Sequence, residues 1–431
     1  MPSLFAAAAG SSTARNIGLY PWLRFFQNLL FWQSVWFLYF QAELSAAEAI
    51  LLYAVFDIGT TVLEVPSGWM SDRVGRRLTL TASAVAGLSG ALLLSIGDSF
   101  ATFALAQVLF GASIAFASGT DSALLYESLM AEGREAEVEA NELRAWRSGF
   151  AALAVSAVVG GLMALWSPVL PFLASAVAFA GMLIVALNLA EPPRRSRAGQ
   201  SGGELARLAS LGSAFREPVL RWLFALSVVL YSFDHIAFVF GQPFIETALA
   251  GAGWRDGTWD LSAAVSGAVT TVMMLCSLLT SLIAPRLRHR LGLASIVLIA
   301  MGMHLALTGL LAFTNEIAAI ALLFLRKVPD ALSRPFILAR IQPILSSDSR
   351  ATYLSLQSLT SKLVFSGSLI LASTTSSEVG AMPFDELQAV LGAYALTGLV
   401  AFCTLIVTAR RLAIDPAPLN RPAGQRGSGP R

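Results

Sequence analysis

The sequence has 431 residues, of which 56% are hydrophobic and only 13% carry a charge, and its mean hydropathy is +0.68. Ordinary soluble domains carry roughly 25% charged residues, and a soluble fold must wet its surface, so this composition excludes a soluble globular protein. The natural solvent for such a chain is a lipid bilayer. A net charge of only +2 also argues against nucleic acid as a partner.

The sequence offers no sign of a metal site or a cofactor. Its two cysteines, Cys276 and Cys403, lie in separate apolar segments, where they are interpreted as small apolar fillers. No paired-histidine metal motif, phosphate-binding glycine loop or nucleophile elbow is present. We therefore expect neither a cofactor nor an enzymatic activity.

About twelve segments meet the requirement of roughly 20 predominantly apolar residues for a membrane-spanning helix. The first six predicted spans are 18–42, 47–69, 78–97, 101–125, 145–166 and 168–190. The second six are 218–241, 261–284, 293–313, 316–339, 352–373 and 388–409. The sequence thus predicts an all-α membrane protein with twelve transmembrane helices in two six-helix bundles related by pseudo-two-fold symmetry.

The arginines predict how the chain is oriented. They are concentrated in alternate loops, after the even-numbered spans, and in the C-terminal tail. By the positive-inside rule these loops and both termini are cytoplasmic, in a multi-pass protein of the cell inner membrane. The predicted organisation is a cytoplasmic lead (1–17), an N-terminal bundle (18–190), a cytoplasmic linker (191–217), a C-terminal bundle (218–409) and a disordered cytoplasmic tail (410–431).

The loop after the second span carries a basic turn with two glycines. It reads Gly68-Trp69-Met70-Ser71-Asp72-Arg73-Val74-Gly75-Arg76-Arg77. Gly68 is expected to admit close approach of another helix, and Gly75 a turn that strains other residues. Asp72, at a helix end, is placed to pair with an arginine.

This segment resembles the loop 2–3 signature of bacterial members of the major facilitator superfamily, and the preceding Glu64 to Ser67 does so too. The resemblance implies a charge latch that favours an outward-facing state, to which we add Glu127 as a partner of Arg76 or Arg77. The second-half loop, 281–290, keeps its basic residues but lacks the Gly–Asp pair. The proline of the antiporter signature in span five is absent beside Gly160 and Gly161, so drug efflux is not predicted.

Ten ionisable residues fall inside predicted spans, and these are Asp57, Glu64, Asp121, Asp234, His235, Arg326, Lys327, Asp330, Arg334 and Lys362. Exposed to lipid, they would cost on the order of 25 kcal/mol, more than typical folding stabilities. They must therefore face one another or a wet cavity. Arg24 lies nearer a predicted helix end and is expected to snorkel to the interface.

Span ten is predicted to be polar and kinked. Arg326, Asp330 and Arg334 recur every four residues, which permits a ladder of ion pairs along the helix. Pro329 and Pro335 interrupt the same helix. A gating helix would look this way, and so would a purely structural ladder.

Lysine usage singles out two positions. Of 29 basic residues, only Lys327 and Lys362 are lysines, and both lie inside predicted spans. A buried lysine can lose its proton whereas arginine stays charged, so these positions are candidates for a compact titratable cation. His235 adjoins Asp234 and is placed either to exchange protons or to pack between helices.

The charges predict a function as well as a site. Acids dominate the spans of the first half and cations those of the second, which suggests a cavity with one acidic and one basic wall. Such a cavity suits a zwitterion, an organic anion with proton coupling, or an amphiphile. We predict a proton-coupled secondary transporter of a small polar or amphipathic solute, with efflux as one direction. The alternative is a non-transporting membrane sensor or partner-binding protein on the same fold.

Roles are assigned to these residues accordingly. Proton coupling is assigned to Asp57, Glu64, Asp121, Asp234 and His235. Substrate binding is assigned to Arg326, Lys327, Lys362 and Tyr53, the last of which shares a helical face with Asp57 and Glu64. Apart from this solute and protons, the only partner expected is the bilayer.

Overall fold

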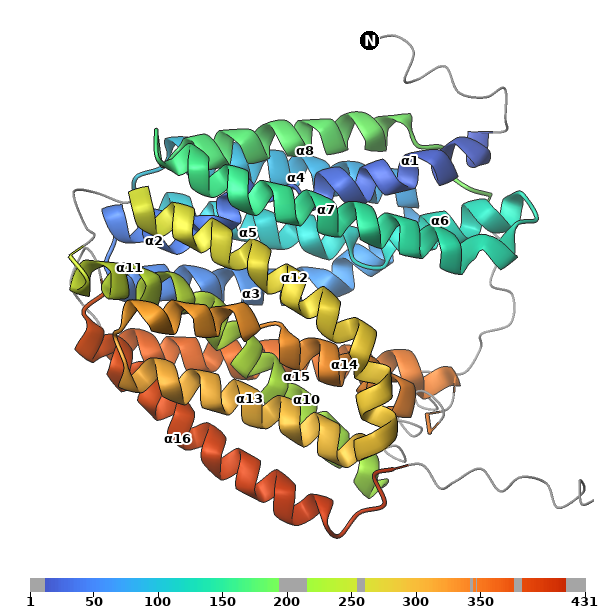
Figure 1. Ribbon diagram of the computed structural model, residues 1–431. Coiled ribbons are helices and arrows are strands. Elements are labelled where there is room, and N and C mark those ends of the chain that lie inside the picture. Colours follow the sequence, from blue (N-terminus) through green and yellow to red (C-terminus); the bar gives the residue numbers. More distant parts are fainter. Residues whose placement is uncertain are drawn as a thin grey trace, which may run out of the picture.

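The computed structural model describes residues 12–193, 215–253, 260–341, 344–345, 347–375 and 382–415. Every regular element within these residues is a helix (Figure 1). The predicted linker and tail lie largely outside the described residues, as do the first eleven residues of the predicted lead. The remainder of that lead belongs to the first helix, which begins at Ser12 rather than at residue 18.

The first half contains six crossing segments. Its elements are α1 (Ser12–Gln27), η1 (Phe31–Ser34), α2 (Trp36–Glu43), α3 (Ala46–Arg73), α4 (Arg76–Ile96), α5 (Phe100–Ala117), α6 (Thr120–Ala131), η2 (Glu135–Glu137), α7 (Val138–Ala164) and α8 (Leu170–Asn188). A capping box begins α3, because Ser45 Oγ accepts from Glu48 N and Glu48 accepts from Ser45 N. Gly119, in the left-handed conformation with φ 73°, separates α5 from α6.

The second half repeats this arrangement. Its elements are α10 (Pro218–Val239), α11 (Gly241–Gly251), α12 (Asp260–Leu291), α13 (Leu293–Phe313), η3 (Ile317–Leu325), α14 (Val328–Ile341), α15 (Ser347–Ala372), η4 (Ser373–Thr375) and α16 (Phe384–Ala409). Ten stretches of the described chain are long and apolar enough to cross a membrane as continuous helices. The first and tenth crossing segments complete the twelve, and both are interrupted by 3₁₀ helix, η1 and η3.

The outer surface is suited to lipid. Large apolar side chains are exposed along the outward faces, among them Leu282 and Val400, each 63% exposed. Aromatic side chains from α2, such as Phe37 and Phe40, are instead fully buried in the hydrophobic core. The apolar composition thus supplies both a core and a lipid-facing belt.

The two halves meet through backbone-to-backbone packing that glycine permits. A Cβ on Gly161 would lie 2.6 Å from the Ala263 carbonyl oxygen, and one on Gly267 would lie 2.4 Å from that of Ala157. These contacts pack α7 against α12 across the boundary seen in Figure 1. Glycines on both helices therefore allow α7 and α12 to pack closely.

One group of contacts between the halves lies at one end of the molecule. We call the end where α1 begins and α16 ends the terminal side, and the end where α2 and α11 lie the distal side (Figure 1). On the distal side Gln242 of α11 accepts from Phe37 N at 3.0 Å and donates to the Gln33 carbonyl at 2.8 Å. Beside this clasp, Trp36 stacks on Phe238. These contacts join the two halves on the distal side.

Candidate functional site

A cavity of about 480 Å³ is lined by α10, α14 and α15, and its lining extends toward the terminal side along α14 and α15. Its walls are Ser227, Leu230, Tyr231, Asp234, His235, Lys327, Asp330, Ser333, Arg334, Ile337, Leu338, Leu354, Gln357, Ser358 and Ser361. This volume falls within the range of small-molecule sites. Five of the predicted ionisable residues line it, and all five come from the second half.

An ion pair joins two walls of the cavity. Lys327 Nζ lies 2.5 Å from Asp234 Oδ2 and 3.8 Å from the Asp330 carboxylate. Asp234 is only 6% exposed, and its other oxygen, Oδ1, has no hydrogen-bond partner among the described residues. The neighbouring His235 ring stacks on Tyr231 with 3.9 Å between centroids. One buried carboxylate oxygen of this cavity-lining residue therefore lacks a donor among the described residues.

The predicted ladder of ion pairs along span ten is wrong. Arg326 turns away from Asp330, donates to the Ala237 carbonyl at 3.2 Å and lies over the Phe238 ring. The 3₁₀ stretch of η3 ends at Leu325, so residue 326 no longer shares a helical face with the residues of α14. Pro335 lies inside α14 and Pro329 in its first turn, as expected for an irregular helix.

Arg326 also lies outside the 480 Å³ cavity. It borders a separate void of about 10 Å³, close to the size of one water molecule. The structure therefore does not bring Arg326 together with Lys327 in one cavity, as the substrate-binding prediction had placed them.

Asp57 lies at the boundary between the halves. Its carboxylate, 3% exposed, accepts from Tyr231 at 3.2 and 3.4 Å and from Ser366 at 3.5 Å. Both donors belong to the second half. One turn earlier on α3, Tyr53 is buried against Phe238 and Phe365, so it contributes packing at this boundary.

A second charged contact crosses the boundary two turns further along α3. Lys362 Nζ of α15 lies 3.1 Å from Glu64 Oε2. The predicted separation into an acidic and a basic wall is therefore wrong, because each lysine inside the membrane is paired with an acid. Pairing within hydrocarbon is favoured since an isolated charge there is costly.

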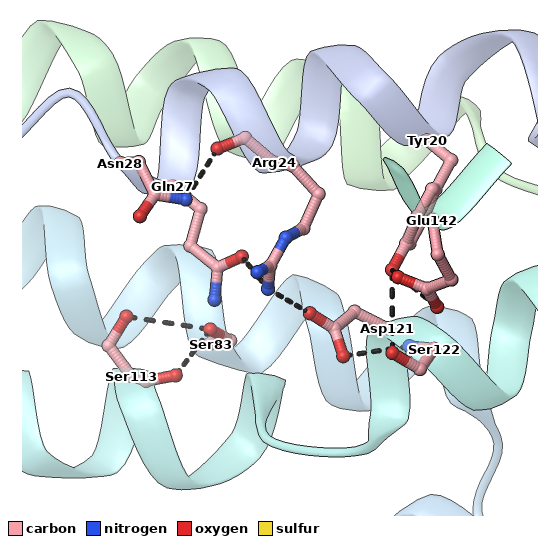
Figure 2. Close-up of polar contacts among 9 residues, drawn as sticks. All are labelled: Tyr20, Arg24, Gln27, Asn28, Ser83, Ser113, Asp121, Ser122 and Glu142. Carbon is pink, nitrogen blue, oxygen red and sulfur yellow. Dashed lines mark hydrogen bonds and ion pairs between the residues drawn. The ribbon is translucent and has the colours of Figure 1, made fainter. Parts of the chain in front are cut away.

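The first half holds its own buried ion pair, shown in Figure 2. Arg24 of α1 lies 2.5 Å from Asp121 Oδ2 of α6, and Asp121 Oδ1 accepts from Ser122 N at 2.7 Å. Nearby, Tyr20 donates to the Glu142 carboxylate at 3.2 Å. Arg24 and Glu142 were not predicted as site residues, because the starts of α1 and α7 lie several residues before the predicted spans.

The predicted latch forms around Arg76. Its guanidinium lies 2.9 Å from Asp72, 3.0 Å from Glu127 and 2.6 Å from Ser71 Oγ. Every one of these partners belongs to the first half. Gly75 has φ 133°, which confirms that the turn requires glycine.

The other members of the motif have different surroundings. A Cβ on Gly68 would meet nothing within 4 Å, so the predicted close approach of another helix there is absent. Arg73 lies over the exposed Trp69 ring, and Arg77 donates to the Leu187 carbonyl at 2.7 Å. The backbone amides of Arg76 and Arg77 donate to Glu191, which the sequence did not single out.

The fold is similar to those of several solved transporter structures. Among solved structures, a point mutant of the nucleoside transporter NupG matches with a TM-score of 0.75 at 14% identity, over 91% of this chain and 99% of that chain. The peptide transporter POT in complex with sulfate matches with 0.71 at 12%, over 92% and 94%. A bacterial homolog of the human lysosomal transporter Spinster, inward-facing and unoccupied, matches with 0.66 at 15%, over 95% and 100%. These likenesses show the fold, and a search of the curated proteins returned no match.

In the described residues, two halves of membrane-crossing helices with a charged cavity in the second half form a multi-pass membrane transporter rather than an enzyme. The family model described as Major Facilitator Superfamily matches residues 18–366. The chain therefore belongs to the major facilitator superfamily, and it is a secondary transporter of a small molecule.

Proposed function

We propose that this chain is a proton-coupled secondary transporter that moves a small polar solute across the inner membrane by alternating access. In this proposal the terminal side, which carries the arginine-rich loops, is cytoplasmic. The distal clasp is closed and the 480 Å³ cavity lies toward the terminal side, so the structure corresponds to an inward-facing state. Rocking of the two halves would open the distal side and close the terminal side, and would so expose the cavity to the other side of the membrane.

The observation that carries the coupling is the position of Asp57. A carboxylate of the first half is buried against hydroxyl donors of the second half, at a boundary that alternating access must open. A buried charge is costly, so protonation of Asp57 stabilises the closed boundary. When the boundary opens, water solvates the carboxylate and the proton can leave. Proton binding and the separation of the halves are in this way linked.

Spin-label distances test this linkage without knowledge of the solute. On a background with Cys276→Ser and Cys403→Ser, one label pair is placed at Glu135 and Arg290 on the terminal side. A second pair is placed at Glu43 and Ala252 on the distal side, all four positions being exposed. On lowering the pH we expect the distal distance to shorten and the terminal distance to lengthen, as measured by double electron–electron resonance in nanodiscs.

Two variants and one transport measurement complete the test. Asp57→Asn is expected to give the low-pH distances at every pH, whereas Asp98→Asn, a matched change at an exposed loop acid, should retain the response. In proteoliposomes, amino acids, peptides, nucleosides and sugars are applied in turn by a rapid increase in concentration. A transported solute should produce a current. Distances that ignore pH in the unmodified protein would refute proton coupling, and transport that survives Asp57→Asn with its pH dependence intact would remove Asp57 from the mechanism.

A further inference from the structure

Two cavity-lining residues of opposite charge have groups that lack a partner among the described residues. Asp234 Oδ1 is buried and accepts no hydrogen bond within the described part of the chain. Arg334 is exposed to the cavity and forms no ion pair or hydrogen bond with any residue that the structure describes. The first group requires a donor such as an ammonium, and the second suits a carboxylate.

The charges that line the cavity otherwise balance. Asp234 and Asp330 face Lys327 and Arg334, so the four side chains sum to zero. A solute with a net charge would leave an uncompensated charge within the membrane, which is costly. A solute with both charges and no net charge satisfies Asp234 and Arg334 together.

We propose that the cavity binds a zwitterionic solute, with its ammonium at the Asp234 carboxylate and its carboxylate at Arg334. This inference rests on the proposed function in that it treats the cavity as the transport site. It goes further by naming the class of solute and the residue that receives each end.

The geometry of α14 also sets the length of that solute. Asp234 is paired with Lys327, and Arg334 follows Lys327 by seven residues, which is roughly 10 Å along a helix axis. Apolar side chains (Leu230, Ile337 and Leu354) line part of the cavity wall. Because the arginine side chain reaches part of this distance, the two charges of the solute should be several ångströms apart. An α-amino acid is too short, and an ω-amino acid with an apolar middle fits.

A chemical ruler tests this proposal on the full-length protein. The probes are unbranched ω-amino carboxylic acids from glycine to ω-aminooctanoate, titrated calorimetrically at neutral pH into detergent-purified protein. We expect affinity to peak at an intermediate length, about tenfold or more above glycine. Hexylamine and hexanoate, which each carry one of the two charges, should bind about tenfold more weakly than ω-aminohexanoate.

Two variants assign the two ends. Arg334→Gln should lower affinity for ω-aminohexanoate about tenfold and leave hexylamine binding unchanged, and Asp234→Asn should lower the binding of both amines. Arg340→Gln, on the same helix but outside the cavity lining, is the matched control and should bind as the unmodified protein does. Unliganded melting temperatures show whether each variant is folded.

The outcomes separate this inference from the proposed function. Affinity that does not depend on chain length, or half-ligands that bind as tightly as the zwitterion, overturns the zwitterion site. Unchanged binding in folded Arg334→Gln overturns the role of that residue. If the ruler fails while the pH-dependent distances persist, only the solute class is wrong. If the ruler binds but no solute produces a current, the site stands and the transport proposal fails.

Discussion

The two halves of the molecule begin their third helices in the same way. In the first half α4 follows Gly75, and Glu191, just after α8, accepts from the amides of Arg76 and Arg77 at 2.8 and 2.9 Å. In the second half α13 follows Gly292, with φ 84°, and Asp415, after α16, accepts from Leu293 N at 2.5 Å. In each case the segment after the sixth helix supplies an anion to the start of the third.

The ion pairs between the first and fourth crossing segments show the opposite behaviour. In the first half the cation, Arg24, lies on the first segment and the acid, Asp121, on the fourth. In the second half the acid, Asp234, lies on the first segment and the cation, Lys327, on the fourth. A helix N-terminus accepts only an anion, which fixes the sign of the cap. An ion pair inside the membrane needs only to be neutral, so either segment can carry the cation. The Asp234–Lys327 pair lies in the cavity, where it can interact with a solute.

The largest expected effect distinguishes these two pairs. Asp121→Asn leaves Arg24 without a counter-ion among the described residues, and breaking a buried pair costs about 3 kcal/mol. Asp234→Asn leaves Lys327 with Asp330 at 3.8 Å and with the cavity, so about 1 kcal/mol is expected. Melting temperatures in detergent should therefore fall much further for Asp121→Asn.

A double variant controls this comparison. Arg24→Gln combined with Asp121→Asn removes both charges and should recover most of the loss, because no unpaired charge remains. Equal losses at Asp121 and Asp234 would show that the two pairs are equally sealed, against the assignment of only one of them to a cavity.

The glycines before the two third helices come next in size. Gly75→Ala places a Cβ 2.7 Å from a Glu191 oxygen, at φ 133°, where about 2 kcal/mol is expected. Gly292→Ala has a nearest contact of 3.1 Å, to Asp415, and should cost about 1 kcal/mol. Gly309→Ala in α13, with open space around it, is the control and should be neutral or stabilising. If Gly292→Ala lowered the melting temperature more than Gly75→Ala, the Glu191 side chain would have moved away from the new Cβ at little cost.

Much of this fold could be predicted from the sequence, since membrane helices reveal themselves as long apolar runs. The interruptions could not. The break of the first segment after Gln27 has no proline or glycine at its position, and residues 316–339 were predicted as one span although they begin as η3. These departures depend on packing against other helices, which no local pattern records.

The sequence analysis identified most of the ionisable residues of the site, but it predicted only some of the ion pairs that they form. The Arg76–Glu127 contact was predicted correctly, because both residues lie at the same end of neighbouring spans. Asp234–Lys327 and Glu64–Lys362 join residues far apart in the chain, for which a single sequence carries no signal. Arg24 was expected to snorkel because its helix was predicted to begin at residue 18, and the true start at Ser12 places it two turns deeper.

The caps should give a smaller and nearly equal effect in the two halves. Glu191→Gln and Asp415→Asn each keep a hydrogen-bond acceptor but remove the charge at a helix N-terminus, for which about 0.5–1 kcal/mol is expected. High salt should shrink the difference from the unmodified protein, because both carboxylates are exposed. A change in melting temperature confined to one half would show that the repeated cap stabilises only that half.

The smallest effect on stability is expected at the latch around Arg76, which belongs to the first half. Arg76 keeps Asp72 and Ser71 when Glu127→Gln is made, so about 0.5 kcal/mol is expected in stability. Because all its partners lie in the first half, the latch is intact while the distal side is closed, and it need not break for that state to form. If the latch acts only in the outward-facing state, its loss should matter only at high pH. Glu127→Lys, which places a cation beside Arg76, should then lengthen the terminal-side distance between Glu135 and Arg290 at high pH and leave it unchanged at low pH. A change of equal size at both pH values would instead assign Glu127 to the stability of the first half alone.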